Sequence, residues 1–249
     1  MERFRRDHKF PKLLSGIVDK VLVAFPNVKD LYNDPKNVVF TGTPVREEFH
    51  RWDKDASRLK LGIDGRPLVV SFWGSLGAEH MNEVITDFIR LNLNSKLFNH
   101  IHATGGSEET TAQMKKKISG HASGYALPRW VDIRTYIDDM PAVMAAADLV
   151  LCRAGASTVA ELTVMGRPAV FVPSPNVTNN HQEKNALLLK KAGGALLLKE
   201  QDCTVETLYR IVEKLLSDKR RLSSMADAMR NAGVRDAADQ IVKIILNME

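Results

Sequence analysis

Short apolar runs alternate along this chain with segments of helical spacing, and no other feature of the sequence constrains the fold as strongly. The runs are VDKVLVAF, NVVFTG, PLVVSFWG, HIHATGG, WVDIR, ADLVLCR, PAVFVP and GALLLK. Helical spacing lies between the later runs, at about 77–91, 107–118, 139–147, 157–165 and 180–192. Apolar strands that alternate with helices are typical of a parallel sheet covered on both faces. The sequence therefore predicts an α/β fold, a Rossmann-like parallel sheet with helices on both faces.

The end of the chain follows a different pattern. From about Val205 to Glu249 there is no further strand, and the spacing predicts two or three amphipathic helices with a break near Gly233. An open parallel sheet binds ligands beyond the carboxyl ends of its strands. The loops that follow the strands are therefore the candidate functional regions.

Composition narrows the class of protein. None of the apolar runs in the 249 residues approaches the roughly 18 residues of a membrane span, and no signal peptide is evident, so we expect a soluble, cytoplasmic protein. Cys152 and Cys203 form no CxxC pair and are predicted to be buried thiols rather than a disulfide or zinc ligands. The net charge of +5 suits a phosphorylated ligand or an acidic membrane, although a solvated basic surface also explains it.

Two loops carry features that suit phosphate groups. In SFWGSLGAEHMNEV a strand ends at a glycine turn and a helix begins at once, an arrangement that lets backbone amides and a helix N-terminus approach an anion. The turn matches neither GxGxxG nor GxxxxGK[ST], and a turn that binds nothing stays an alternative. In TGTPVREEF, Pro44 stiffens the chain before Arg46, whose guanidinium suits a diphosphate. The alternative is a solvent-facing Arg46 paired with a nearby glutamate.

Two further loops suit hydroxyl groups. In LCRAGASTVAEL, small residues open a helix and Glu161 follows among apolar neighbours, where it could accept hydrogen bonds from a ribose or complement the helix dipole. In FVPSPNVTNNHQEKNALLLKKAGGA, Asn180 and Glu183 have the spacing of a capping box. His181, Gln182 and Asn185 add donors and acceptors that suit a sugar, although an ordinary surface helix start would be similarly polar.

Taken in order, six segments resemble the MurG-type family of bacterial UDP-N-acetylglucosamine transferases. These segments are GTPVR, GSLGA, YIDDM, CRAGASTVAEL, GRPAVFVPSP and NHQEKNA, and the similarity extends from about Val18 to the C-terminus. The family transfers GlcNAc from UDP-GlcNAc to undecaprenyl-diphosphate-muramoyl-pentapeptide in peptidoglycan biosynthesis. Its members have the GT-B fold, two Rossmann-like domains that face a cleft. The resemblance implies that this chain is the C-terminal, donor-binding half.

The resemblance also assigns roles to individual residues. The diphosphate would be held by Arg46, Gly74, Ser75, Gly77 and Ala78. The uracil would meet the backbone of Ile137 and the ribose would meet Glu161, while the phosphate and sugar side would be lined by Ala156, Ser157 and Thr158. The sugar hydroxyls would be read by His181, Gln182 and Asn185, with His181 replacing a frequent glutamine. Trp73 and Leu76 stand where the family commonly has Gly and Gln, so a side-chain contact at that turn is expected to be lost or replaced by aromatic packing.

No Gly-rich loop such as GGTGGH occurs before residue 43. By resemblance, 1–43 would be a remnant of an N-terminal acceptor domain with its linker, 44–234 the donor domain, and 235–249 a helix that crosses back. The hinge would lie near Pro44. We expect apolar surface to be exposed in these segments, including Val21, Leu22 and Val23. The catalytic base is expected in the missing domain, so no catalytic residue is assigned here.

The resemblance implies direct, inverting displacement of UDP without a metal or cofactor, and the Asp138-Asp139 pair is expected to cap a helix rather than bind an ion. Expected partners are UDP-GlcNAc, a lipid-linked acceptor bound through a missing domain or partner, and the inner face of the bacterial membrane. An alternative is a non-catalytic UDP-sugar-binding subunit of a split two-chain transferase, which the upstream gene sequence would distinguish. An NAD site and nucleic-acid binding lack their ordered motifs.

Overall fold

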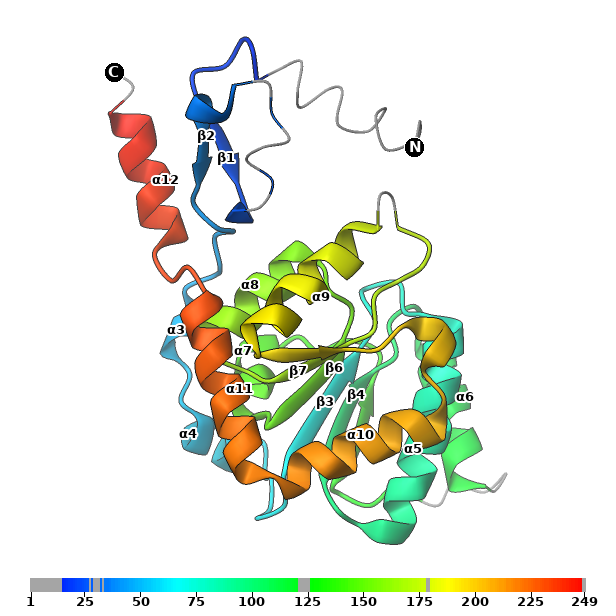
Figure 1. Ribbon diagram of the computed structural model, residues 1–249. Coiled ribbons are helices and arrows are strands. Elements are labelled where there is room, and N and C mark those ends of the chain that lie inside the picture. The colour runs from blue at the N-terminus through cyan, green and yellow to red at the C-terminus, as the bar shows by residue number, and fades with distance from the viewer. Residues whose placement is uncertain are drawn as a thin grey trace.

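The computed structural model describes residues 15–26, 28, 32, 34–120, 126–177 and 180–247, and its centre is a six-stranded sheet of order β5-β4-β3-β6-β7-β8 (Figure 1). The strands are β3 (Leu68–Phe72), β4 (Asn99–Ala103), β5 (Val131–Arg134), β6 (Leu149–Cys152), β7 (Ala169–Phe171) and β8 (Ala195–Leu197). Every pairing in this sheet is parallel. This strand order is that of a dinucleotide-binding sheet: from β3 the chain adds strands first on one side, as β4 and β5, and then on the other, as β6, β7 and β8. The predicted fold class is confirmed.

Helices cover both faces of the sheet, and each face has its own apolar core. One face carries α7 (Met140–Ala146), α8 (Ala156–Met165) and α9 (His181–Ala192). The other carries α5 (Glu79–Ser95), α6 (Glu108–Ser119) and α10 (Val205–Ser217). Successive strand residues face opposite cores, as Val69 and Val70 do. Burial on both faces explains why β3, β6 and β7 are apolar runs without alternation.

The remaining helices lie before β3 and after β8, and the last of them follows the domain. They are α3 (Glu48–Arg51), α4 (Lys54–Lys60), α11 (Lys219–Ala232), α12 (Ala237–Leu246) and the short 3-10 turns η2 (Pro35–Asn37) and η4 (Glu200–Asp202). The five predicted internal helices correspond to α5 to α9 within four residues at each end. The predicted tail helices are α10, α11 and α12, and Gly233 ends α11 as expected. In the described part of the chain, none of the helices is both long enough and apolar enough to span a bilayer.

A second, two-stranded parallel sheet precedes the domain. It pairs β1 (Val21–Val23) with β2 (Val38–Phe40), and it lies apart from the main sheet on the side toward which α12 extends (Figure 1). Residues 1–14 of the predicted acceptor-domain remnant, and 248–249 of the crossing helix, lie outside the described residues.

The expectation of exposed apolar surface on β1 is wrong for Val23, which is 5% exposed, and Val21 and Leu22 are half-buried. The backbone pairing of β1 with β2 continues past the strand ends, where the amides of Thr41 and Gly42 both donate to the Val23 carbonyl. Exposed apolar side chains are found elsewhere in these segments, at Ile17, Val18, Phe40, Val242, Ile245 and Leu246.

The segments that enter and leave the domain touch each other. Gly42 has a left-handed φ of +75°, and a Cβ atom added to it would lie 2.8 Å from the Val234 Cβ. Real Cβ atoms do not approach so closely, so Gly42 allows the two linkers to pack side by side. The hinge near Pro44 stays a prediction, since nothing in the structure tests it.

A buried polar network joins β3, β4 and α5. The Ser71 hydroxyl hydrogen-bonds His100 Nε2 at 2.8 Å and His102 Nδ1 at 2.7 Å, and His102 Nε2 lies 3.2 Å from Asn82 Oδ1. Burial lowers the pKa of His102 to about 3 and that of His100 well below its ordinary value. Both rings are therefore neutral at physiological pH, and the folded state resists their protonation.

This network predicts a loss of stability in mild acid. The unfolded His102 titrates near pH 6.5 and the folded one near 3, so its contribution is present above 6.5 and is lost as pH falls toward 3. For His102 alone the loss between pH 8 and pH 5 is about 2 kcal/mol. Urea unfolding at both pH values measures it. His102→Gln should show a smaller pH-dependent loss, whereas His80→Gln, at an exposed site, should keep the wild-type loss; equal losses in all three proteins would contradict the assignment.

Candidate functional site

The sheet order has a topological switch point between β3 and β6. The loop after β3 leads to α5 on one face, and the loop after β6 leads to α8 on the opposite face. Neighbouring parallel strands whose connections diverge in this way leave a gap at their carboxyl ends, where ligands of α/β proteins bind. The loops after β4, β5, β7 and β8 begin at the same edge of the sheet.

The glycine turn after β3 is built from close backbone contacts. Gly74 and Gly77 have left-handed φ angles of +97° and +72°, and the Gly77 amide donates to the Gly74 carbonyl at 3.1 Å. A Cβ on Gly77 would lie 2.3 Å from the Thr104 carbonyl oxygen, and one on Gly105 would lie 2.3 Å from the Gly77 nitrogen. A side chain on Gly77 or on Gly105 would therefore collide with the backbone of the other loop. The loop around Thr104, which contacts the glycine turn, was not predicted, because the run HIHATGG indicates only a strand.

Two unusual residues flank this turn and have opposite environments. Trp73 is 3% exposed, and the Arg153 guanidinium lies 5.8 Å from its ring centroid, so aromatic packing is present as expected. Within the described residues its Nε1 has no hydrogen-bond partner. Leu76 is 89% exposed at the tip of the turn, beside exposed Ser75. Ala78 precedes the first residue of α5 and is half-buried.

Arg46 combines the two interpretations that the sequence left open. Its Nη1 lies 3.3 Å from Glu48 Oε2, with both side chains 60% exposed, as the surface alternative predicts. Its guanidinium also lies 5.3 Å from the centroid of the Phe49 ring. Its positive charge also opposes part of the upward pKa shift of Glu161, a second residue of the predicted site.

Glu161 lies in α8 and is half-buried, as its apolar neighbours indicated. Burial raises the pKa of its carboxyl group, and the positive charge of Arg46 partly opposes that shift. Glu161 in turn helps burial to raise the pKa of the Cys152 thiol at the end of β6. Cys152 and Cys203 are both buried and free, as predicted.

The first turn of α8 consists of residues with small side chains. Gly155 is its N-cap, Ala156 and Thr158 are half-buried, and Ser157 is exposed. The residues at this helix start are therefore all small. Their predicted contacts with phosphate and sugar are not tested by this geometry.

The capping box predicted for Asn180 and Glu183 is wrong. Asn180 does occupy the N-cap of α9, but it has a left-handed φ of +50°. An N-cap that accepts from first-turn amides is normally extended. Asn180 Nδ2 instead donates to Glu183 Oε2 at 3.3 Å, so the two side chains bond each other and leave the backbone uncapped by Asn180.

The polar residues of α9 hold neighbouring loops in place. Gln182 Oε1 accepts from the Ser174 amide at 3.0 Å, and Asn185, which is 7% exposed, donates from Nδ2 to the Ala154 carbonyl at 3.0 Å. These bonds tie α9 to the loops that follow β7 and β6. His181 is exposed at the helix start. Loop anchoring therefore explains part of the amide content, and sugar recognition stays a prediction.

The loop after β5 places Ile137 at the same edge, where the whole residue is 2% exposed. Its predicted backbone contact with uracil stays a prediction. Asp139 is the N-cap of α7, but its carboxylate accepts from Arg134 Nη1 at 2.7 Å rather than capping the helix. The predicted side-chain cap at Asp138-Asp139 is therefore wrong, because an arginine five residues earlier competes for the carboxylate.

A polar cleft of about 550 Å³ opens beside the α9 loop. It is lined by His80, Pro173, Ser174, Pro175, Asn180, Glu183, Lys199, Glu200 and Gln201. Three of these residues, Lys199, Glu200 and Gln201 in the segment after β8, were not predicted from the sequence. The rule that ligands bind beyond strand ends would have indicated them, but they carry no glycine-rich motif.

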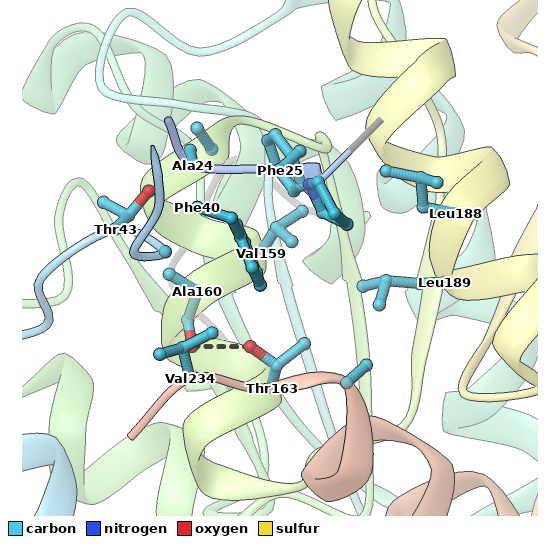
Figure 2. Close-up of a pocket in the computed structure, with 14 residues that line it drawn as sticks. Ala24, Phe25, Phe40, Thr43, Val159, Ala160, Thr163, Leu188, Leu189 and Val234 are labelled. Atoms are coloured by element: carbon cyan, nitrogen blue, oxygen red, sulfur yellow. Dashed lines mark hydrogen bonds between the residues drawn. The ribbon is translucent and has the colours of Figure 1, made fainter. Parts of the chain in front are cut away.

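An apolar pocket of about 240 Å³ lies where the linkers meet the domain. Figure 2 shows Phe25 and Phe40 of the N-terminal segment facing Val159 of α8 and Leu188 and Leu189 of α9. Val234 closes the pocket from the segment before α12. Ala156 is the one lining residue that also belongs to the predicted donor site.

Comparison with known proteins identifies the domain. Residues 68–241 match the model of the glycosyltransferase family 28 C-terminal domain. The chain belongs to this family. It is 40% identical over 235 residues to a UDP-N-acetylglucosamine--N-acetylmuramyl-(pentapeptide) pyrophosphoryl-undecaprenol N-acetylglucosamine transferase of Acetivibrio thermocellus, covering 94% of this chain and 62% of the relative. A relative with the same name from Caldanaerobacter subterraneus is 37% identical, with 63% of its length covered.

Solved structures agree with this assignment. The crystal structure of Acinetobacter baumannii MurG superposes with a TM-score of 0.72 and 26% identity, covering 94% of this chain and 63% of MurG. The S. aureus MnaA structure with UDP has a TM-score of 0.69 at 14% identity and shows a likeness of fold. The predicted family is confirmed. The chain spans less than two thirds of the length of MurG and of the two named relatives, and the roles of single residues stay predictions.

The electrostatic effect of Arg46 on Glu161 gives a direct test of whether the two charges interact. Arg46→Met should raise the pKa of Glu161 further, because the opposing positive charge is lost. Carbon NMR titration of the Glu161 carboxyl measures the shift. Arg51→Met is the matched control, since Arg51 is an exposed arginine paired with Glu47. Equal pKa values for Glu161 in all three proteins would show that the two charges do not interact.

Proposed function

We propose that this chain binds UDP-GlcNAc at the carboxyl edge of its sheet and provides the donor half of an N-acetylglucosamine transferase. The acceptor is a lipid-linked muramoyl-pentapeptide, by the names of its relatives. The observation that carries the proposal is that, apart from Arg46, the predicted residues follow the carboxyl ends of β3, β5, β6 and β7 in one parallel sheet, so they share one edge. Exposed Arg46 and half-buried Glu161 carry opposite charges, and the charge of Arg46 opposes the raised pKa of Glu161. A cation and a carboxylate whose charges interact suit the two parts of a nucleoside diphosphate.

The diphosphate would lie over the glycine turn. Gly74 and Ser75 are exposed there, and α5 begins immediately afterwards at Glu79. A helix N-terminus and backbone amides favour negative charge, and Arg46 can add a charge-assisted contact. The same groups would stabilise the charge that develops on UDP as it leaves.

The nucleoside and sugar would extend to either side. Glu161 would accept hydrogen bonds from the ribose hydroxyls, and the backbone at Ile137 would meet the uracil. His181, Gln182 and Asn185 would face the GlcNAc hydroxyls, with Ala156, Ser157 and Thr158 between sugar and phosphate. Gln182 and Asn185 each already use one side-chain atom to hold a loop, so their orientation is set before a ligand arrives.

Transfer requires an acceptor-binding domain, in the same polypeptide or in a partner. In this proposal 44–234 binds the donor, while 1–43 and 235–249 contact the acceptor domain at the inner face of the membrane. The acceptor hydroxyl displaces UDP with inversion, and its base comes from the acceptor domain. The exposed side chains of Phe40, Val242, Ile245 and Leu246 support such a contact. The 249 residues alone are expected to bind donor without turnover.

Calorimetry distinguishes this function from that of other Rossmann-like proteins. Titration of the chain with UDP-GlcNAc should release or absorb heat with saturation, because the site matches a uridine diphosphate sugar. Titration with NAD should give no binding heat, since the turn lacks the GxGxxG spacing. Binding of NAD in place of UDP-GlcNAc would refute the proposal.

Removal of the Glu161 carboxylate tests the ribose contact. Glu161→Ala should weaken UDP binding by about 1–3 kcal/mol, the cost of losing a charged hydrogen-bond acceptor. Wild-type affinity should also rise with pH through the raised pKa of Glu161, because the ionised form is the better acceptor. Both are measured by calorimetry. The control is Glu206→Ala, an exposed glutamate in the first turn of α10; an equal loss there would show that the effect of Glu161→Ala is not specific to the ribose contact.

A further inference from the structure

Arg153 contacts the segments that follow three other strands. It comes directly after β6, its Nη1 donates to the Val172 carbonyl at 2.9 Å, and it forms an ion pair with Glu200. Its guanidinium also lies 5.8 Å from the ring centroid of Trp73. Val172 follows β7, Glu200 follows β8 and Trp73 follows β3. One side chain therefore joins four strand ends at the edge where the donor is proposed to bind.

The ion pair is enclosed. The side chains of Arg153 and Glu200 are 11% and 16% exposed, so neither charge is freely solvated. Removal of one partner from such a pair leaves the other buried without compensation, which makes the geometry of the pair demanding. Nη1 alone donates to both the Glu200 carboxylate and the Val172 carbonyl, and the planar guanidinium also contacts the Trp73 ring. An ammonium group has no flat surface for such an aromatic contact.

The segments that Arg153 joins carry both halves of the proposed site. Trp73 is adjacent to the glycine turn, which faces the diphosphate. Val172 begins the loop whose Ser174 amide is held by Gln182, and Ala154, next to Arg153, is held by Asn185. The spacing between the turn and the sugar-facing side of α9 therefore depends on this guanidinium, which is not one of the groups expected to touch the ligand.

We propose that Arg153, locked by Glu200 and Trp73, is a positioning residue that sets how well the site distinguishes a UDP-sugar from UDP alone. The inference rests on the proposed function. Loss of Arg153 would let the α9 side move relative to the glycine turn, so contacts with the sugar would weaken more than contacts with the nucleotide.

A matched arginine lies at the opposite edge of the sheet. Arg66 forms an ion pair with Asp64, and its guanidinium lies 4.8 Å from the centroid of the Trp130 ring. It precedes β3, and Trp130 precedes β5, so this cluster is at the amino ends of the strands. Arg66→Met therefore removes the same kinds of contact far from the proposed site and controls for a general loss of stability.

The experiment measures the dissociation constants of UDP and UDP-GlcNAc by calorimetry, with Tm in parallel. We expect Arg153→Met to lower the preference for UDP-GlcNAc over UDP about ten-fold, and Arg66→Met to leave it unchanged within about two-fold, whatever happens to Tm. Arg153→Lys should fall between, because it keeps the charge without the planar fork. Glu200→Gln should match Arg153→Met, and the double variant should be no worse than either alone.

The outcomes separate the two proposals. If the wild-type chain does not bind UDP-GlcNAc, the proposed function fails. If it binds and the preference is unchanged in the Arg153 and Glu200 variants, the positioning role is overturned, and a lowered Tm then marks the pair as structural. Should Arg153→Met not fold, Arg153→Lys and Glu200→Gln decide the question in the same assay.

Discussion

The reversal of strand order between β3 and β6 is the constraint on which the rest of the structure depends. It sends α5 and α8 to opposite faces, so the loops after β3 and β6 diverge at the carboxyl edge of the sheet. The loop after β3 also packs against the loop after β4, where the backbone contact of Gly77 with Thr104 leaves no room for a side chain on Gly77. The predicted site is therefore a consequence of topology first and of residue chemistry second.

Polar side chains behind this edge fix the loops that form it. Asn82 donates to the Thr104 carbonyl at 2.9 Å, while Asn185 and Gln182 hold the loops after β6 and β7. Each of these bonds involves a backbone group that could not be left buried without a partner, at a cost of about 1–3 kcal/mol. The same amides that suggest a ligand in the sequence are thus also needed by the fold, and Gln182 and Asn185 perform both tasks in the proposed function.

Much of this could be predicted from the sequence, because strand and helix periods, glycines and the motif order are local properties. Failures occurred where a distant or competing contact decided the outcome. The side chain of Asp139 bonds Arg134, Asn180 adopts a left-handed conformation that its sequence spacing does not reveal, and Val23 is buried in the small sheet that β1 forms with β2. The cleft after β8 was missed because Lys199 and Glu200 acquire meaning from neighbours that only the folded sheet supplies.

The two charges at the centre of the proposed site differ in how firmly the protein holds them. Arg46 is 60% exposed and pairs with an equally exposed Glu48, a contact that contributes little to stability and can be exchanged for a diphosphate at small cost. Glu161 is half-buried, and its raised pKa shows that the fold holds its ionised form at a disadvantage. Hydroxyl groups that donate to this carboxylate would remove part of that disadvantage, so the site is prepared for a ligand by one weakly held cation and one incompletely solvated anion. A fully exposed glutamate in place of Glu161 would already be solvated, so hydroxyl groups would gain less by donating to it.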